Sequence, residues 1–179
     1  MRIICALTFI AGPAFAETCP AVADHSIRQA EILAELQSLE TPGGSRELSQ
    51  ELWTLWTDAP DDKAQALLDE GMRKREGFDL LGARDVLDQL IEYCPDYAEG
   101  YNQRAFANFL RQDYDAALFD LDQALAIMPT HVAALSGKAL TLIGMGREDD
   151  AQVVLREALA LNPWLTERGL LLEPEGEKI

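Results

Sequence analysis

Residues 98–129 read AEGYNQRAFANFLRQDYDAALFDLDQALAIMP, and this stretch contains the pattern that decides the fold. It is predicted to form two helices. In the second helix, Ala117, Leu121 and Ala124 recur at i, i+4 and i+7, which places them on one face. Pro129 then ends the pair, because proline cannot donate a hydrogen bond to the preceding turn and disfavours helix just before itself.

The same pattern recurs with a period of 34 residues. Pro95, Pro129 and Pro163 are separated by this interval, and a repeat of this length indicates stacked copies of one supersecondary unit. Five further sets of small or apolar residues keep the same register: Gly71, Ala105 and Ala139; Ala83, Ala117 and Ala151; Leu87, Leu121 and Leu155; Leu67, Tyr101 and Leu135; Leu90, Ala124 and Ala158.

These residues resemble the tetratricopeptide repeat, a helix pair of 34 residues with small residues in the middle and a closing proline. The resemblance covers three units, approximately residues 64–97, 98–131 and 132–165. It implies an all-α fold, a short right-handed helical-repeat solenoid of antiparallel helix pairs. The third unit departs from the family pattern at Gly144 and Gly146, which we expect to loosen the end of its first helix.

Two segments flank the repeats, which together with a C-terminal cap occupy residues 61–172. Residues 17–60 are predicted to form an N-terminal helical hairpin or a degenerate repeat, in which Trp53 and Trp56 serve as packing residues. After Pro163, the stretch WLTERGLLLE is predicted to form a short helix that caps the last unit, since solenoids need such caps. Residues 173–179 are predicted to be disordered.

The first 16 residues, MRIICALTFIAGPAFA, are predicted to be a secretory signal peptide cleaved near Ala16. We therefore expect the protein to be periplasmic or secreted. Loss of Cys5 with this segment leaves Cys19 and Cys94, and thiols in an exported chain meet an oxidising environment. We predict that these two cysteines form a disulfide across the repeats, the alternative being two free thiols.

The charge of the chain excludes several classes of partner. It carries 31 acidic against 15 basic residues, a formal net charge of −16. This balance argues against binding nucleic acid or an anionic membrane, both of which require clustered Lys and Arg. No second apolar stretch approaches the length of a membrane span.

The sequence also lacks the motifs of common catalytic and metal sites, so we predict no enzymatic activity, no cofactor and no metal. His25 and His131 lie in different predicted elements. His131 is expected to have a turn or capping role at a helix start, and Asp96 is a candidate cap for the helix after Pro95.

The family resemblance implies that ligands lie along a concave groove lined by the first helix of each pair. The candidate groove residues are Met72, Arg75, Glu99, Asn102, Phe106, Phe109, Leu140 and Ile143. Some family members clamp a peptide's terminal carboxylate with Lys, Asn and Arg on these faces. Leu68, Ser136 and Leu140 replace such residues here, so we expect a largely apolar groove without that clamp.

These observations predict an exported, non-catalytic interaction module or scaffold that binds a protein or an extended peptide. Three alternatives remain open at this point: a small-molecule or lipid carrier, an accessory subunit of an envelope enzyme, and a self-assembling structural module. A further alternative is that the segment Leu165 to Leu172, or the N-terminal helix, fills the groove itself.

Overall fold

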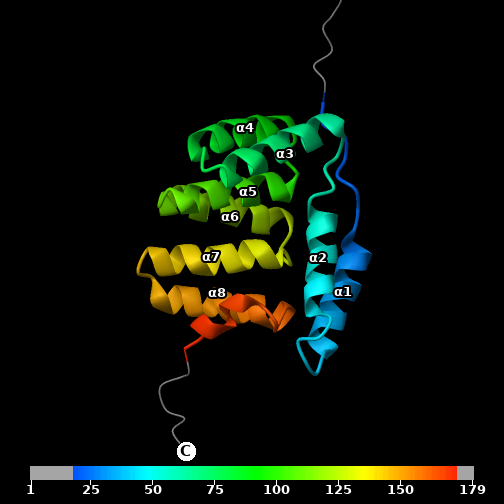
Figure 1. Ribbon diagram of the computed structural model, residues 1–179, viewed down its shortest axis with the longest axis vertical. Helices are drawn as coiled ribbons and strands as arrows, with labels where there is room; N and C mark the ends of the chain where they lie inside the picture. The colour runs from blue at the N-terminus through cyan, green and yellow to red at the C-terminus, as the bar shows by residue number, and fades with distance from the viewer. Residues whose placement is uncertain (1–17, 173–179) are drawn as a thin grey trace, which may run out of the picture.

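The computed structural model describes residues 18–172, which form eight α-helices, one short 3-10 helix and no strand (Figure 1). The predicted signal peptide and the C-terminal tail lie outside this range. The helices are α1 (Ser26–Ser38), α2 (Ser45–Trp56), α3 (Asp62–Glu76), α4 (Leu80–Tyr93), α5 (Ala98–Leu110), α6 (Tyr114–Ile127), α7 (Val132–Gly144) and α8 (Glu148–Leu161), followed by the 3-10 helix η1 (Thr166–Leu170).

Helices α3 to α8 stack as three antiparallel pairs, α3–α4, α5–α6 and α7–α8 (Figure 1). The residues in the 34-residue register lie between these helices: Ala83, Ala117 and Ala151 are fully buried. At Gly71, a Cβ atom would lie 2.7 Å from the Leu87 side chain, so the first pair packs too closely for a larger residue. The predicted all-helical repeat architecture is confirmed.

The first helix of each pair ends in the same way. Phe78, Gln112 and Gly146, spaced 34 residues apart, have positive φ angles of 60°, 61° and 72°. The next residue in each case closes a six-residue hydrogen-bonded turn of the Schellman type. The three backbone bonds run from Asp79 N to Lys74 O (2.9 Å), from Asp113 N to Asn108 O (3.0 Å) and from Arg147 N to Leu142 O (2.9 Å).

The glycines of the third unit therefore do not loosen its first helix, and that expectation was wrong. Gly146 supplies the left-handed residue that ends α7 at no steric cost. Gly144 leaves room for a neighbouring ring, because a Cβ atom there would lie 2.7 Å from Tyr114.

Side-chain caps begin several helices. Asp61 accepts a hydrogen bond from Ala64 N (2.8 Å) at the start of α3, and His131 accepts one from Ala134 N (3.3 Å) at the start of α7. The predicted capping role of His131 is confirmed. The prediction for Asp96 was wrong, because Tyr97 occupies the N-cap position of α5 and makes no side-chain capping bond.

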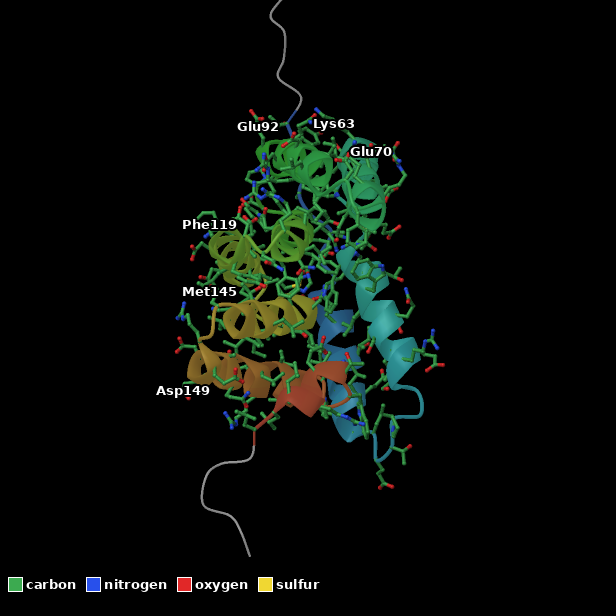
Figure 2. All side chains as sticks on the ribbon, turned by 60° about the vertical axis from the view of Figure 1, so that its left-hand side comes forward. Lys63, Glu70, Glu92, Phe119, Met145 and Asp149 are labelled. Carbon is green, nitrogen blue, oxygen red and sulfur yellow. A yellow bond between two sulfur atoms is a disulfide. The ribbon has the colours of Figure 1, made fainter. Side chains whose placement is uncertain are left out.

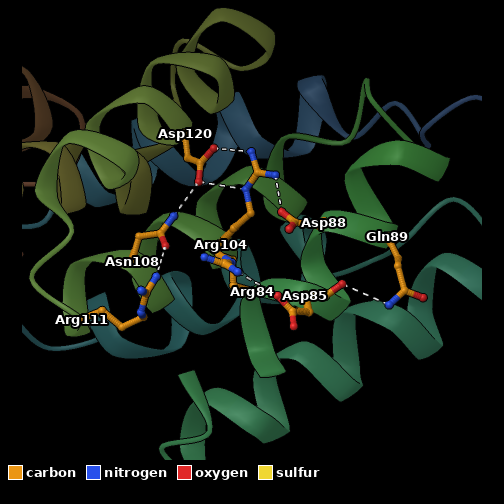
Figure 3. A network of polar contacts seen from close by, with 8 residues as sticks. All are labelled: Arg84, Asp85, Asp88, Gln89, Arg104, Asn108, Arg111 and Asp120. Atoms are coloured by element: carbon orange, nitrogen blue, oxygen red, sulfur yellow. Dashed lines mark hydrogen bonds and ion pairs between the residues drawn. The ribbon is translucent and has the colours of Figure 1, made fainter. Parts of the chain in front are cut away.

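Salt bridges join successive pairs on the stack. The Arg104 guanidinium on α5 contacts Asp88 on α4 (2.6 Å) and Asp120 on α6 (2.5 Å), as Figure 3 shows. Burial raises the pKa of the Asp120 carboxyl, against the lowering effect of Arg104. One period further along the chain, Lys138 contacts Asp122 (2.7 Å), so the interaction between units is itself repeated.

The α1–α2 hairpin, residues 26–56, does not extend the stack as a further repeat. It runs alongside the stack, roughly across the helices of the repeats, and we call it the strut (Figure 1). Its buried residues Ile32, Leu36, Leu52 and Trp56 pack with Val132 at the start of α7. Helices α3 and α4, on which Figure 2 labels Lys63, Glu70 and Glu92, form one end of the stack. The turn between α1 and α2 lies at the opposite end of the molecule (Figure 1).

The residue before each register proline contacts the N-terminal segment. Cys94 forms a disulfide with Cys19, with Cα atoms 5.2 Å apart, which confirms the predicted pairing. Met128 packs against the core of the strut, and Asn162 Nδ2 donates a hydrogen bond to Ser49 Oγ (3.4 Å). Residues 18–56 therefore touch all three repeats along one edge.

The residues two positions after Pro95 and Pro129, which are Tyr97 and His131, contact the strut along the same edge. Tyr97 Oη donates a hydrogen bond to the Trp56 carbonyl (2.7 Å), and the Trp56 ring stacks on His131 with ring centroids 4.3 Å apart. Beyond the last repeat, Trp164 Nε1 donates to the Leu36 carbonyl (2.9 Å). The strut is thus bonded to the start of the second repeat and to the segment beyond the last repeat.

The segment after α8 folds back onto the last repeat. Gln152 on α8 donates a hydrogen bond to Leu170 O (3.0 Å) and accepts one from Leu172 N (2.8 Å). The predicted cap is therefore present as the short helix η1. No helix between residues 18 and 172 has the length and apolar character needed to cross a membrane.

Candidate functional site

A cavity of about 410 Å³ opens on the face formed by the first helices of the repeats, and we call it the groove cavity. Helices α5 and α7 supply most of its lining, α3 supplies Arg75 and the strut supplies Trp53. The lining residues are Trp53, Arg75, Asn102, Gln103, Ala105, Phe106, Phe109, Leu121, Ala133, Ser136, Gly137, Leu140, Thr141, Leu165, Thr166 and Glu167.

Five of the eight candidate groove residues meet at this cavity: Arg75, Asn102, Phe106, Phe109 and Leu140. The other three do not line it. Met72 packs against the buried cluster of the first repeat, and Ile143 packs against the core between α7 and α8. Glu99 is only 1% exposed and lies beneath the surface of the groove.

The sequence analysis did not identify two segments that line the cavity. Trp53 packs against the core of the strut as predicted, and it also lines the cavity. Residues 165–167, which follow the last repeat, also line it. The repeat register carries no information on either segment, because both lie outside the repeats. These parts of the chain border the cavity and leave it open.

Beneath the cavity, the carboxylate of Glu99 accepts hydrogen bonds from three side chains. Asn102 Nδ2 lies 3.1 and 3.2 Å from its two oxygens, Gln103 Nε2 donates to one, and His131 Nε2 lies 2.8 Å from the other. Because His131 Nδ1 accepts from Ala134 N, the ring proton is on Nε2 and the imidazole donates to Glu99.

This polar chain continues to the cavity. Gln103 Oε1 accepts a hydrogen bond from the guanidinium of Arg75, whose Cζ atom lies 4.4 Å from the centroid of the Phe106 ring. Arg75 is only 9% exposed, and burial lowers its pKa. The nearest ion-pair contact is with Glu76 Oε1 at 3.8 Å. The cavity therefore contains a buried, stacked cation beside aromatic side chains.

The arrangement suits binding more than chemistry. Ser136 and Thr141 line the cavity, but the Thr141 hydroxyl donates to the Gly137 carbonyl (2.8 Å). His131 is fully buried beneath the cavity and engaged through both ring nitrogens. Within residues 18–172, no three His, Cys, Asp or Glu side chains are grouped so as to hold a metal ion.

Stacked helix pairs with a hollowed inner face define a helical-repeat solenoid, a class of protein whose concave surface is its binding surface. The family model of the tetratricopeptide repeat matches residues 109–163. This match and the relatives below support a tetratricopeptide-repeat protein.

Relatives and solved structures agree with this assignment. The chain is 30% identical over 118 residues, 66% of its length, to a TPR repeat-containing protein of Rhizobium etli, and it spans only 58% of that protein. It is similar to the first TPR of Spaghetti (RPAP3) bound to the HSP90 peptide SRMEEVD, with a TM-score of 0.59, 20% identity, and 60% of this chain and 86% of that chain covered. The TPR2B domain of yeast Sti1 in its pHsp70 complex gives a TM-score of 0.57 and 24% identity, covering 62% and 91% of the chains.

Proposed function

We propose that the protein is an exported, non-catalytic interaction module that binds an extended segment of a partner protein in the groove cavity. The observation that carries the proposal is the cavity itself. Phe106 is 45% exposed at its lining, and Phe109 and Leu140 extend the apolar surface. Arg75 and Asn102 provide polar anchors beside it. Apolar surface combined with a few fixed polar groups is typical of peptide-binding sites. The peptide complexes of the two solved neighbours support this choice.

The disulfide supports the exported part of the proposal. Disulfides persist in oxidising compartments and are rare where thioredoxin and glutathione keep thiols reduced. Cys94 is 1% exposed in its bonded state, so the bridge is part of the folded core. Detection of the mature chain in a periplasmic or extracellular fraction, beginning near residue 17, is the expected result. A chain found only in the cytoplasm with two free thiols would contradict it.

Capture of partners by paired variants tests the binding site. The double variant Phe106→Glu, Phe109→Glu places two charges in the cavity and is expected to abolish capture of partners from an envelope extract. Phe119→Glu is the matched control, because Phe119 is 60% exposed on α6 and does not line the cavity. Circular dichroism verifies that each variant is folded. Equal capture by both variants would remove the cavity from the proposal.

A small-molecule carrier is the second candidate, and the cavity's size favours it. A volume of about 410 Å³ lies within the range of small-ligand sites, about 300–1,000 Å³. Native mass spectrometry of gently purified protein separates the two functions. A carrier should show the mass of the chain plus a small molecule of constant mass. A peptide-binding module should show the mass of the chain alone or of its complex with a protein partner.

A further inference from the structure

The groove cavity has opposite charges at its two ends. We propose that the bound segment carries an acidic side chain beside Arg75, a large apolar side chain among Phe106, Phe109 and Leu140, and a basic side chain beside Glu167. This inference rests on the proposed function, because it names the chemistry of the segment that the cavity accepts.

Arg75 provides the positive end. A guanidinium has five N–H donors, but within the described residues Arg75 makes one hydrogen bond, to the neutral amide of Gln103. The contact with Glu76 is long, at 3.8 Å, and Glu76 is itself exposed. A buried cation without a well-bonded carboxylate is unfavourable, so a ligand carboxylate at this wall of the cavity gains a strong, charge-assisted pair.

Glu99 acts on the charge of Arg75 only through space and makes no direct ion pair with it. Its oxygens already accept hydrogen bonds from Asn102, Gln103 and His131, and the Gln103 amide stands between it and Arg75. The chain of bonds instead holds the guanidinium in place from behind, while the Phe106 ring supports its face. The cation is thus oriented before any ligand arrives, which reduces the entropy lost on binding.

Glu167 provides the negative end. It lies in η1, beyond the third repeat, whereas Arg75 lies in α3 of the first, so the two groups are at opposite ends of the stack (Figure 1). Within residues 18–172, Glu167 accepts a hydrogen bond from Thr166 Oγ1 (3.1 Å), and no Lys or Arg side chain pairs with it. A basic side chain of the ligand is the complementary group.

The two charges favour a peptide over a single-headed amphiphile. A fatty acid satisfies Arg75 with its carboxylate but leaves the carboxylate of Glu167 beside its apolar chain, which is unfavourable. The net charge of −16 also disfavours a uniformly acidic peptide. An extended segment that carries one side chain of each sign, with an apolar residue between them, matches both ends at once.

Fluorescence anisotropy with designed peptides tests the proposal on the full, oxidised chain. The probes are labelled extended peptides that contain Asp, Phe and Lys in this order and in the reverse order, at spacings of two to five residues. Matched probes replace Asp by Asn or Lys by Gln. We expect the best charged probe to bind about tenfold more tightly than either matched probe.

Variants assign each preference to its residue. Arg75→Gln is expected to erase the preference for Asp over Asn, and Arg75→Lys to retain it. Glu167→Gln should erase the preference for Lys over Gln, and Glu167→Lys should reverse it. The controls are Arg73→Gln on α3 and Glu157→Gln on α8, both exposed and outside the cavity, and they should change nothing.

The outcomes separate this inference from the proposed function. Peptides that bind, and lose binding in Phe106→Glu, but show no charge preference overturn the charge pattern and leave the proposed function intact. Binding of dodecanoate that depends on Arg75, with no peptide binding, overturns both. Absence of binding by every probe also overturns both. If Arg75→Gln does not fold, an unreversed preference in Glu167→Lys overturns the inference by itself.

Discussion

At the scale of single residues, Phe78 occupies a backbone conformation that suits glycine. Its φ angle is 60° and its side chain is 76% exposed, so the ring contributes little packing to offset the steric strain. Phe78→Gly is expected to raise the free energy of unfolding by about 0.5–1 kcal/mol, because relief of the left-handed strain exceeds the added entropy of the unfolded chain. Urea unfolding measures the change.

Gly146 is the matched position in the third repeat and should respond in the opposite direction. Gly146→Ala adds a Cβ atom at a φ angle of 72° and is expected to lower the free energy of unfolding by about 1 kcal/mol. If both substitutions shift the urea midpoint in the same direction, backbone strain is not the cause.

The buried carboxylate of Glu99 accepts hydrogen bonds from the three side chains beneath the cavity. Glu99→Gln turns one accepting oxygen into a donor that faces other donors, from Asn102, Gln103 or His131. We expect a loss of about 2–4 kcal/mol in the free energy of unfolding. Glu92→Gln, at an exposed position on α4, should change it by less than about 0.5 kcal/mol. A tolerated Glu99→Gln would mean that the carboxylate is not needed.

The sequence could identify some of these residues and not others. His131 follows Pro129 at a helix start, so its capping role was predictable from local signals. Glu99 was assigned to the groove because the family resemblance places its position, with Asn102 and Phe106, on the ligand-binding face. Its carboxylate also binds His131, 32 residues away, and no local pattern reports a contact at that separation.

At the scale of elements, the disulfide joins the N-terminal segment to the end of α4. The cysteines are 75 residues apart in sequence, and Cys94 is buried. Closing a loop of this length is expected to contribute about 4 kcal/mol in the chain-entropy model. Urea unfolding with and without dithiothreitol, and of the Cys19→Ser variant, measures the loss. Identical midpoints with the bond present and absent would contradict this contribution.

The elements themselves were predictable, but the position of the strut was not. The 34-residue register indicates three stacked pairs because each unit repeats the same buried face. Ile32, Leu36 and Leu52 show that α1 and α2 also have an apolar face, yet they do not show which surface covers it. The covering surface comes from the ends of the repeats, including Val132, and from Trp164 beyond them. The pairing of Cys19 with Cys94 was the one sequence signal of this arrangement.

At the scale of the whole molecule, the strut changes how stability is distributed. In a simple solenoid each repeat contacts only its neighbours, so the terminal repeats open first. Here Trp164 ties the last repeat to Leu36, and Tyr97 ties the second to Trp56. Trp164→Ala is expected to lower amide protection in α8 by about tenfold or more, with less change in α5.

Hydrogen exchange followed by mass spectrometry resolves the two helices. Phe119→Ala is the control, because its side chain is 60% exposed and lies away from the strut. Equal loss of protection in α5 and α8 on Trp164→Ala would indicate one cooperative unit, in which the strut does not act on the last repeat separately.

The strut also has a mechanical consequence. The curvature of a repeat solenoid can vary, because small rotations between neighbouring repeats add along its length. Residues 18–56, which include the strut, run along this stack and are attached to it at both ends, by the disulfide at the first repeat and by the Trp164 hydrogen bond beyond the last. A change in the curvature of the stack therefore requires these attachments to break. The width of the opening is therefore set before any partner is present, and recognition proceeds close to a rigid fit.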